Sequence, residues 1–294
     1  MSDSTPAYYL AGTGFPAPAL PAGLYVVSTP IGNLRDITIR ALETLAGAST
    51  ILCEDTRTSA KLLDHYGIKG RRMALHEHNE RDRAADIVAR VGAGEAVALI
   101  SDAGTPLLSD PGFPLIRAMT EAGLPVIPIP GPSALLAALV VAGLPTDAFS
   151  FRGFLPPKSG ARANALAALS DSRETLVFYE SPRRLADTLS AMADAFGERQ
   201  AVVALELTKR FERTRRGSLA ELAAAFSGEE VKGEAVIVVA GATETVIAPE
   251  DWQAALEAAM AEQPLRAAVD EVAAGYGLKR KEVYDAALRL KARQ

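Results

Sequence analysis

Residues 98–116 have the sequence ALISDAGTPLLSDPGFPLI, in which an apolar run ends at two turns rich in small residues. The apolar run begins at Ala96 and predicts a short buried strand. Each turn carries one aspartate, Asp102 or Asp110. In open α/β sheets, ligands bind beyond the carboxyl ends of the strands. Asp102 is therefore a candidate ligand-binding residue, whereas Asp110 is expected to cap a turn.

Short apolar runs alternate with helical segments through most of the chain, which predicts an α/β fold with strands buried on both faces. A first block of such runs covers 24–29, 50–53, 96–101 and 125–130. A second block covers 149–154, 175–180, 201–207 and 234–241, with helical segments at 159–169, 182–195 and 218–227. Two sheets fit this length better than one.

The predicted organisation is two α/β domains, at 24–135 and 136–245, between two segments of different composition. Residues 1–23 are rich in Ala, Gly and Pro, and a flexible tail is expected there. Their Gly12-x-Gly14-x-x-Ala17 pattern is not taken as a dinucleotide site, because no strand precedes it and prolines follow. Residues 246–294 predict a helix-turn-helix-like extension, with helices at 251–262, 264–274 and 279–290.

The composition is that of a globular chain, since 49% of its 294 residues are hydrophobic. No stretch long enough to cross a bilayer occurs, and the N-terminus does not resemble a signal peptide, so a cytoplasmic location without membrane attachment is expected. The single cysteine, Cys53, excludes an internal disulfide. A net charge of −5 argues against whole-surface attraction to nucleic acid but allows a local basic face.

Four loops that follow predicted strands carry the candidate chemistry: TPIGN (29–33), SDAGTP (101–106), PGPSA (130–134) and ESPRR (180–184). Their small residues allow a ligand to approach the backbone closely, and Ser133 is placed to cap the following helix. No GxxxxGK[ST] motif is present to hold a triphosphate. The loops therefore favour a nucleoside with a polar tail.

Eight motifs in order resemble the tetrapyrrole methylase superfamily. They are STPIGNLRDIT, CEDTRTSAKLL, HEHNE, SDAGTPLLSDPG, PGPSALLAAL, FYESPRRL, ELTKRFE and KGEAVIVV. Within this superfamily, the chain is most similar to the branch of bacterial enzymes that methylate the 2′-oxygen of a cytidine in 16S ribosomal RNA. The resemblance covers residues 24–241, and residues 250–292 resemble the C-terminal extension of that branch.

The resemblance implies that S-adenosylmethionine binds between the two α/β domains, usually in a homodimer. The implied cofactor positions are Pro30, Ser101, Asp102, Ala103, Gly104, Pro106, Ser133, Ala134, Glu180 and Leu207. Where relatives carry a methionine-glycine pair after the second-domain strand, this chain has Glu180 and Ser181. This departure favours a polar acceptor over a porphyrin-like ring. The resemblance implies that the acceptor is 16S rRNA in the small ribosomal subunit.

Transfer of a methyl group to a ribose hydroxyl benefits from a base, because the hydroxyl is a weak nucleophile. The candidate catalytic residues are Glu54, Asp55, Glu180, His78 and Lys209, the last as a stabiliser of the developing oxyanion. For Glu54 and Asp55, a helix-capping role is an equal alternative. His76 and His78 are predicted on one face of a strand, but too few further ligands exist for a metal site, and none is expected.

Basic residues of the strand-end loops are candidates for contact with RNA phosphate. They are Arg57, Lys158, Arg183, Arg184, Lys209 and Arg213. A solvated surface is the alternative for the basic run at 208–216. Two other functions remain open from the residues alone: a methyltransferase for small tetrapyrrole-like molecules or a protein-modifying relative of it, and a ligand-binding or regulatory module without catalysis.

Overall fold

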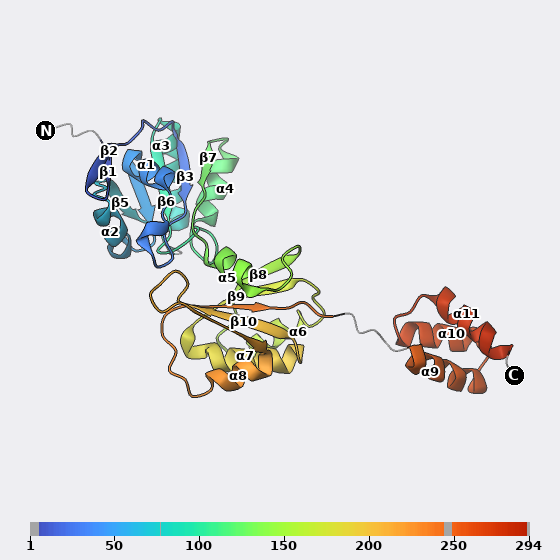
Figure 1. Cartoon of the computed structure of the whole chain (residues 1–294). Coiled ribbons are helices and arrows are strands. Elements are labelled where there is room, and N and C mark those ends of the chain that lie inside the picture. Colours follow the sequence, from blue (N-terminus) through green and yellow to red (C-terminus); the bar gives the residue numbers. More distant parts are fainter. Residues whose placement is uncertain (1–5, 77, 244–248, 293–294) are drawn as a thin grey trace. The chain divides into compact units, whose positions relative to one another are not determined.

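The computed structural model describes residues 6–76, 78–243 and 249–292. The chain divides into two compact units, residues 1–242 and 243–294. The larger unit contains two five-stranded sheets with their helices, and the smaller unit is helical (Figure 1).

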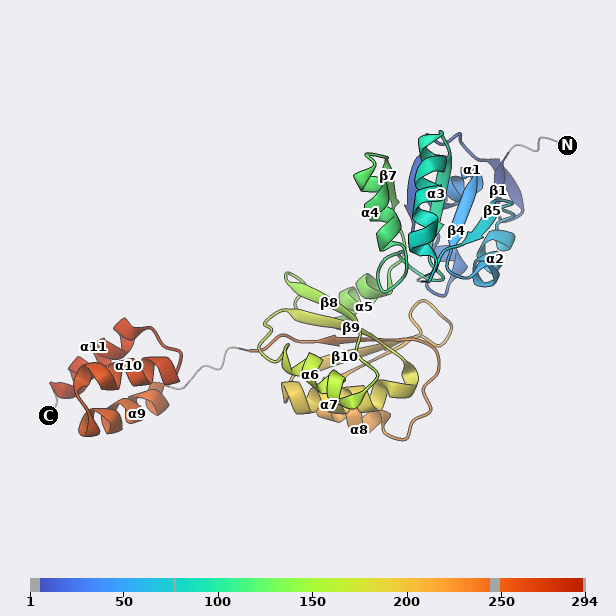
Figure 2. The ribbon, with the colours of Figure 1, turned by 180° about the vertical axis from the view of Figure 1, so that it is seen from behind.

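The first sheet is entirely parallel, with the strand order β5-β4-β6-β3-β7. Its strands are β3 (Gly23–Val27), β4 (Thr50–Cys53), β5 (Arg71–Ala74), β6 (Ala96–Ile100) and β7 (Val126–Ile129). One face packs against α1 (Ile39–Gly47) and α2 (Thr56–His65), and the other against α3 (Glu80–Gly92) and α4 (Phe113–Glu121). Figure 2 shows α3 and α4 from their own side of the sheet.

Strand β6 shows why the apolar runs are uninterrupted. Ala98 and Ile100 belong to the core beneath α1 and α2, whereas Val97 and Leu99 belong to the core beneath α3 and α4. All five residues of β6 are buried, because successive side chains of a strand point to opposite faces and both faces are covered.

The second sheet is mixed, with the order β11-β10-β12-β9-β8, in which only β8 and β9 are parallel. Its strands are β8 (Phe149–Phe154), β9 (Thr175–Glu180), β10 (Gln200–Leu205), β11 (Arg213–Ser218) and β12 (Ala235–Val239). Three helices cover one face: α6 (Ser159–Ala167), α7 (Leu185–Phe196) and α8 (Leu219–Phe226). Helix α5 (Ala134–Ala142) covers the opposite face (Figure 1). Short 3-10 helices lie at Leu34–Asp36 and Pro182–Arg184.

Residues 6–23 do not form the expected flexible tail. Strands β1 (Ala7–Leu10) and β2 (Thr13–Pro16) form a hairpin whose turn residues, Ala11 and Gly12, both have positive φ, as a two-residue hairpin turn requires. Tyr8 is buried in the core of the first sheet, and the Tyr9 amide donates to the Tyr66 carbonyl at 2.9 Å. Burial of one tyrosine and this backbone bond fix the hairpin. Residues 1–5 of the predicted tail lie outside the described residues.

Two further differences from the sequence predictions concern basic and histidine-containing segments. The basic residues from Arg213 onward form the edge strand β11, not a solvated helix or loop, because β10 offers its free edge for antiparallel pairing. The histidines do not lie on a strand, since β5 ends at Ala74 and the His76 amide is bonded to the Asn79 side chain in a turn. Among the described residues, no cluster of His, Cys, Asp and Glu has the arrangement of a metal site.

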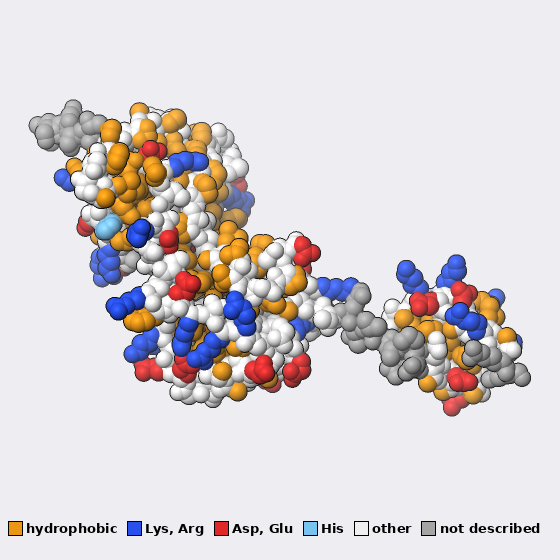
Figure 3. Space-filling view, viewed as in Figure 1, with side chains coloured by type: hydrophobic (Ala, Val, Ile, Leu, Met, Phe, Trp, Pro, Cys, Tyr) orange, Lys and Arg blue, Asp and Glu red, His pale blue; other side chains and the backbone are white. Residues whose placement is uncertain are grey.

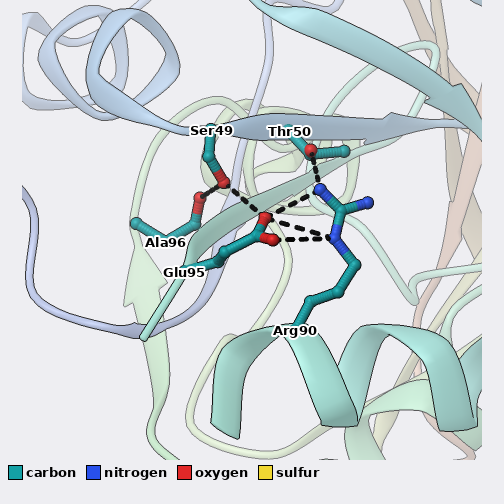
Figure 4. A network of polar contacts seen from close by, with 5 residues as sticks. All are labelled: Ser49, Thr50, Arg90, Glu95 and Ala96. Atoms are coloured by element: carbon teal, nitrogen blue, oxygen red, sulfur yellow. Dashed lines mark hydrogen bonds and ion pairs between the residues drawn. The ribbon is translucent and has the colours of Figure 1, made fainter. Parts of the chain in front are cut away.

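At the amino-terminal edge of the first sheet, a polar network joins α3 to two strands (Figure 4). The Arg90 guanidinium forms a 2.7 Å ion pair with Glu95 and donates to the Thr50 hydroxyl at 2.6 Å. The Ser49 hydroxyl bonds to Glu95 and to the carbonyl of Ala96, both at 2.9 Å. Every residue of the network therefore has a partner.

The smaller unit consists of α9 (Pro249–Glu262), α10 (Leu265–Gly275) and α11 (Arg280–Lys291). These helices bury a core of their own that includes Trp252, Leu256, Val269 and Val283. Within the described part of the chain, no helix has the length and apolarity that crossing a membrane requires.

Candidate active site

A cavity of about 480 Å³ lies in the larger unit, where the loops after several strands meet. The loops after β3, β4, β6, β7 and β9 all contribute to its wall, together with the segment before β12. Its lining residues are Ile31, Glu54, Asp102, Ala103, Gly104, Thr105, Leu108, Ser109, Asp110, Ala134, Phe154, Tyr179, Glu180, Ser181, Pro182, Gly233, Glu234, Ala235 and Val236.

The loops after β3 and β6 form the base of this site. The strand order places β3 beside β6, while their connections run toward opposite edges of the sheet, so this is a topological switch point. Thr29 and Gly104 exchange two backbone hydrogen bonds, of 2.8 and 3.0 Å. Gly104 has φ +81°, a conformation that favours glycine, and a Cβ there would lie 3.3 Å from Ile31. The backbone of the β6 loop is thereby fixed at the cavity.

Asp102 lines the cavity and is largely open to solvent. One of its carboxylate oxygens accepts a 3.2 Å hydrogen bond from the Asp55 amide. The partial burial of the carboxyl raises its pKa, and the bond from Asp55 offsets only part of this effect. Asp102 thus retains acceptor capacity toward the cavity.

Asp110 also lines the cavity, although the sequence suggested only a turn-capping role. Burial, together with the neighbouring carboxylate of Glu54, raises its pKa to about 6, although a hydrogen bond with Ser101 opposes this rise. Its neighbours Leu107 and Ser109 have positive φ angles of 76° and 70°. The loop therefore holds a half-buried carboxyl that titrates near neutral pH at the cavity wall.

Glu54 and Asp55 are adjacent in sequence but face different surroundings. Glu54 lines the cavity, whereas Asp55 does not. Asp55 is the N-cap of α2, where it accepts from the Arg57 amide at 2.8 Å and pairs with the Arg57 guanidinium at 2.9 Å. These hydrogen bonds lower the pKa of Asp55 to about 2. Such a carboxylate is a weak base, so the helix-capping alternative describes Asp55 better than the catalytic one.

Glu180 lines the cavity, but its carboxylate is already occupied. Only 2% of the residue is exposed, and it forms a 2.6 Å ion pair with Arg184. It also accepts from the Thr188 hydroxyl at 2.7 Å and from the Ser181 amide at 2.6 Å. These contacts disfavour Glu180 as a proton acceptor. The ion pair also occupies the Arg184 guanidinium, which disfavours Arg184 as a ligand for RNA phosphate.

Lys209 lies between two carboxylates, with its Nζ atom 2.8 Å from Glu206 and 3.0 Å from Glu234. Burial opposes the charge of Lys209, but the two hydrogen bonds outweigh it and raise its pKa. Glu234 lines the cavity and Lys209 does not, so the ammonium group lies behind Glu234 and not at the cavity wall itself. His78 is exposed and does not line the cavity.

The predicted cofactor residues separate into two groups. Those that line the cavity are Asp102, Ala103, Gly104, Ala134 and Glu180. Pro30, Ser101, Pro106, Ser133 and Leu207 do not line it, although Leu207 lines a smaller adjoining hollow with Ile31 and Ala134. Ser133 occupies the N-cap of α5 without the expected capping bond, and its buried hydroxyl has no hydrogen-bond partner among the described residues. A buried hydroxyl in this state suits a polar ligand group.

Two aromatic wall residues were not predicted, Phe154 and Tyr179. Their ring centroids are 5.7 Å apart, and the Tyr179 hydroxyl accepts a 3.2 Å bond from the Leu135 amide at the start of α5. Burial raises the pKa of Tyr179, as does the nearby charge of Asp110. Their position at the carboxyl ends of β8 and β9 is the sequence signal that identifies them.

The predicted RNA-binding cations differ in how they are held. Lys158 and Arg183 are exposed, and neither forms an ion pair with another described residue. Arg57 pairs with Asp55, and Arg213 pairs with Glu229 at 2.6 Å. Figure 3 shows Lys and Arg side chains together with Asp and Glu on the part of the larger unit that contains the second sheet. The basic face is therefore local and interspersed with acids.

Family models match both units of the chain. The model of the tetrapyrrole (corrin/porphyrin) methylases matches residues 23–223, and the model of the RsmI C-terminal HTH domain matches residues 246–291. Among solved structures, the methyltransferase CobJ superimposes with a TM-score of 0.56 at 19% identity, covering 75% of this chain and 95% of that chain. A uroporphyrin-III-C-methyltransferase from Thermus thermophilus gives a TM-score of 0.54 at 21% identity, covering 74% and 94%. These likenesses show the fold.

Sequence relatives are closer and extend over nearly the whole chain. The ribosomal RNA small subunit methyltransferase I of Mesorhizobium japonicum is 50% identical over 281 residues, covering 95% of this chain and 96% of the relative. The protein of the same name from Pseudomonas aeruginosa is 46% identical, covering 90% and 96%. The chain therefore belongs to the tetrapyrrole methylase family and, within it, to the group of proteins named ribosomal RNA small subunit methyltransferase I.

Proposed function

We propose that the chain transfers a methyl group from S-adenosylmethionine to the 2′-oxygen of a cytidine in the 16S ribosomal RNA of the small subunit. The observation that carries this proposal is the cavity at the strand ends, in a chain whose relatives carry the name of a small-subunit rRNA methyltransferase. A structural neighbour, a uroporphyrin-III C-methyltransferase, is described as complexed with S-adenyl homocysteine, which supports the cofactor.

The residues of the cavity fit such a cofactor. The carboxylate of Asp102 complements the positive charge of a sulfonium and of an amino group. Ala103 and Gly104 present backbone without large side chains, and the Ser133 hydroxyl beside Ala134 lacks a partner within the described structure. When bound, S-adenosylmethionine supplies an electrophilic methyl group. The cavity wall supplies position and charge.

We infer that a cavity carboxylate accepts the proton of the ribose hydroxyl. Among the predicted bases, Glu54 lines the cavity beside Asp110, whereas Asp55 and His78 do not line it. Asp110, beside Glu54, has a pKa of about 6, close to the range in which a general base works best at neutral pH. Lys209 pairs with Glu206 and Glu234 and does not line the cavity, which disfavours it as a direct stabiliser of the developing oxyanion.

Methyl transfer from labelled S-adenosylmethionine tests this function. We expect label in small ribosomal subunits or their free RNA, confined to the 2′-oxygen of cytidine, and none in a porphyrin precursor. Labelling of the porphyrin precursor alone would instead support the small-molecule alternative. With Asp110→Asn, we expect the rise in kcat near pH 6 to disappear while cofactor affinity is retained; an unaltered pH profile would assign the proton to Glu54.

The helical unit at 249–292 is proposed to recognise RNA, because its family model is that of an HTH domain and its core is separate. A chain that ends at Thr243 is expected to fold, to bind S-adenosylmethionine and to lose methylation of its ribosomal substrate. Full activity of this shortened chain would exclude a recognition role. Loss of cofactor binding would make the unit part of the methylase core.

We also propose a homodimer in the cytoplasm, where ribosomal RNA is modified. Helix α5 supports the dimer, since Leu136 and Val140 are apolar and 52% and 75% exposed. Sedimentation of Val140→Glu tests this surface: a shift from dimer to monomer is expected. An unshifted dimer would move the interface elsewhere.

A further inference from the structure

The loop that joins β10 to β11, residues 206–212, presents an aromatic side chain to solvent. Phe211 is 73% exposed, and the Arg210 guanidinium lies 5.6 Å from the centre of its ring. A guanidinium at this distance from an aromatic ring forms a cation–π pair. An exposed ring beside a guanidinium offers a flat face on which another planar group can stack.

The backbone of this loop is held firmly by its own acids. Glu206 and Thr208 have positive φ angles of 51° and 66°, which L residues adopt at a cost of about 1 kcal/mol each. The Thr208 amide donates to the Glu212 carboxylate at 2.6 Å. Glu206 accepts from Lys209 at 2.8 Å and from the Glu234 amide at 3.0 Å. These acids therefore shape the loop rather than neutralise Arg210.

Close approaches to two glycines fix the loop beside the candidate active site. A Cβ at Gly233 would lie 1.8 Å from the Glu206 carboxylate, and one at Gly32 would lie 2.3 Å from the Lys209 side chain. Gly233 and Glu234 line the active-site cavity. The loop that carries Arg210 and Phe211 is thus attached directly to the cavity wall.

An open groove of about 630 Å³ lies along the loop. It is lined by Leu205, Glu206, Arg210, Phe211, Glu212, Arg213, Glu230 and Lys232. Arg213 pairs with Glu229, and Lys232 pairs with Glu230. Pairs of this kind at the surface contribute little to stability, so these cations can exchange a carboxylate for a phosphate. The groove therefore combines an aromatic face with cations, as single-stranded nucleic-acid sites do.

We propose that Phe211 and Arg210 form a stacking platform for an unpaired base of the RNA substrate, next to the nucleotide in the active site. This proposal rests on the proposed function, because it assumes that the substrate is RNA. Stacking of a base on an aromatic side chain tolerates any base and commonly contributes a factor of about ten or more to affinity. The platform holds the strand while the cavity holds the reacting ribose.

Kinetics on small ribosomal subunits test the platform. Phe211→Ala is expected to raise KM about tenfold, with kcat and the affinity for S-adenosylmethionine unchanged. Phe211→Trp is expected to restore KM, because tryptophan also stacks. Phe113→Ala is the matched control, since Phe113 is 69% exposed at the start of α4 and does not line either cavity. Equal KM values for Phe211→Ala and Phe113→Ala would overturn the proposal.

Fluorescence gives a readout that does not depend on methyl transfer. The chain has a single tryptophan, Trp252, so a Trp252→Phe, Phe211→Trp variant reports from the loop alone. We expect a short single-stranded oligocytidylate RNA to quench this signal and an RNA duplex to leave it unchanged. Absence of quenching by the single strand, or quenching that follows self-association in sedimentation, would refute the platform. Failure of the unaltered chain to methylate RNA would instead refute the proposed function.

Discussion

The two ends of the first sheet differ in how completely their polar groups are bonded. At the amino-terminal edge, Arg90, Glu95, Ser49 and Thr50 form a closed network (Figure 4). At the carboxyl-terminal edge, Asp102 receives a single hydrogen bond from Asp55, and the buried Ser133 hydroxyl has no partner among the described residues. In the first case the bonds hold the sheet and its helix together. In the second, acceptor capacity is kept for a ligand.

This difference separates stability from binding within one sheet. A polar group that is hydrogen-bonded within the protein adds to the stability of the fold whether or not a ligand is bound. A polar group with spare capacity near a cavity contributes little until a ligand arrives. Substitutions at the two ends are therefore expected to affect different measurements.

The largest effect on stability is expected from Arg90→Ala. Removal of the guanidinium breaks charge-assisted bonds to Glu95 and a bond to Thr50, which should lower the free energy of unfolding by about 2 kcal/mol. Urea unfolding measures this loss, and calorimetry should show unaltered affinity for S-adenosylmethionine. Arg117→Ala, which removes an exposed pair with Glu121, is the control and should leave unfolding unchanged. A loss of cofactor affinity in Arg90→Ala would contradict the division between groups that stabilise the fold and groups that bind the cofactor.

Asp102→Ala is expected to act in the opposite way. Loss of an acceptor at the cavity should weaken S-adenosylmethionine binding about tenfold, or about 1.4 kcal/mol, with little change in unfolding. Calorimetric titration gives the affinity, and Asp86→Ala on the exposed face of α3 is the control. Unchanged affinity would remove Asp102 from the binding site.

Asp110→Asn is expected to stabilise the fold at pH values above about 6 and not in acid. The pKa of Asp110 in the folded state, about 6, lies above the ordinary value of 3.8. The contribution of this carboxyl to the free energy of unfolding is therefore full below about pH 4 and is lost as the pH rises through 6. Asparagine does not ionise, so the variant does not lose this stability as the pH rises. We expect a gain of about 1 kcal/mol at pH 8, reduced by solvent screening of a half-buried group, and no gain at pH 4. Equal gains at both pH values would contradict a raised pKa.

The smallest effect is expected at Ser133, and Ser218 provides the comparison. Both serines occupy helix N-caps, but Ser218 forms a reciprocal capping box with Glu221, whereas Ser133 forms no capping bond. Ser218→Ala should cost about 1 kcal/mol, and Ser133→Ala less than about 0.5 kcal/mol. Thermal unfolding with and without S-adenosylmethionine sharpens the contrast, because only Ser133→Ala should reduce the stabilisation by the cofactor.

The sequence predicted strands best where burial on both faces leaves an uninterrupted apolar run. The ranges 50–53 and 175–180 coincide with β4 and β9, which are almost entirely buried. The range 149–154 also coincides with β8, although only one residue of β8 is fully buried. Strand β11 was missed because its arginines lie on an edge, where pairing with β10 overrides composition. The N-terminal hairpin was missed because Tyr8 and Tyr9 find their partners far along the chain, in the core and at Tyr66.

For the candidate site, the position of a residue directly after a predicted strand indicated whether it lines the cavity. The sequence did not indicate the burial, pairing or pKa of that residue. Asp102 was predicted from its place at the end of β6, and it lines the cavity. The pKa of Asp110 depends on burial and on Glu54, which follows a different strand, so its turn sequence gave no sign of it. Whether Glu180 is free or paired likewise depends on Arg184 and Thr188 turning back over the strand end. Tertiary contacts, which no local pattern encodes, decide these roles.

The close approach of Lys209 to Gly32 limits how this protein can be recombined with its relatives. The side chain of Lys209 covers the backbone of Gly32 so closely that a β-carbon there would lie 2.3 Å from Cγ. In a chimera that takes the first sheet from one parent and the second sheet from another, residue 32 and residue 209 therefore come from different parents. Chimeras in which residue 32 and the 206–212 loop come from the same parent are expected to fold, whereas a parent with a side chain at residue 32 is incompatible with a lysine at 209.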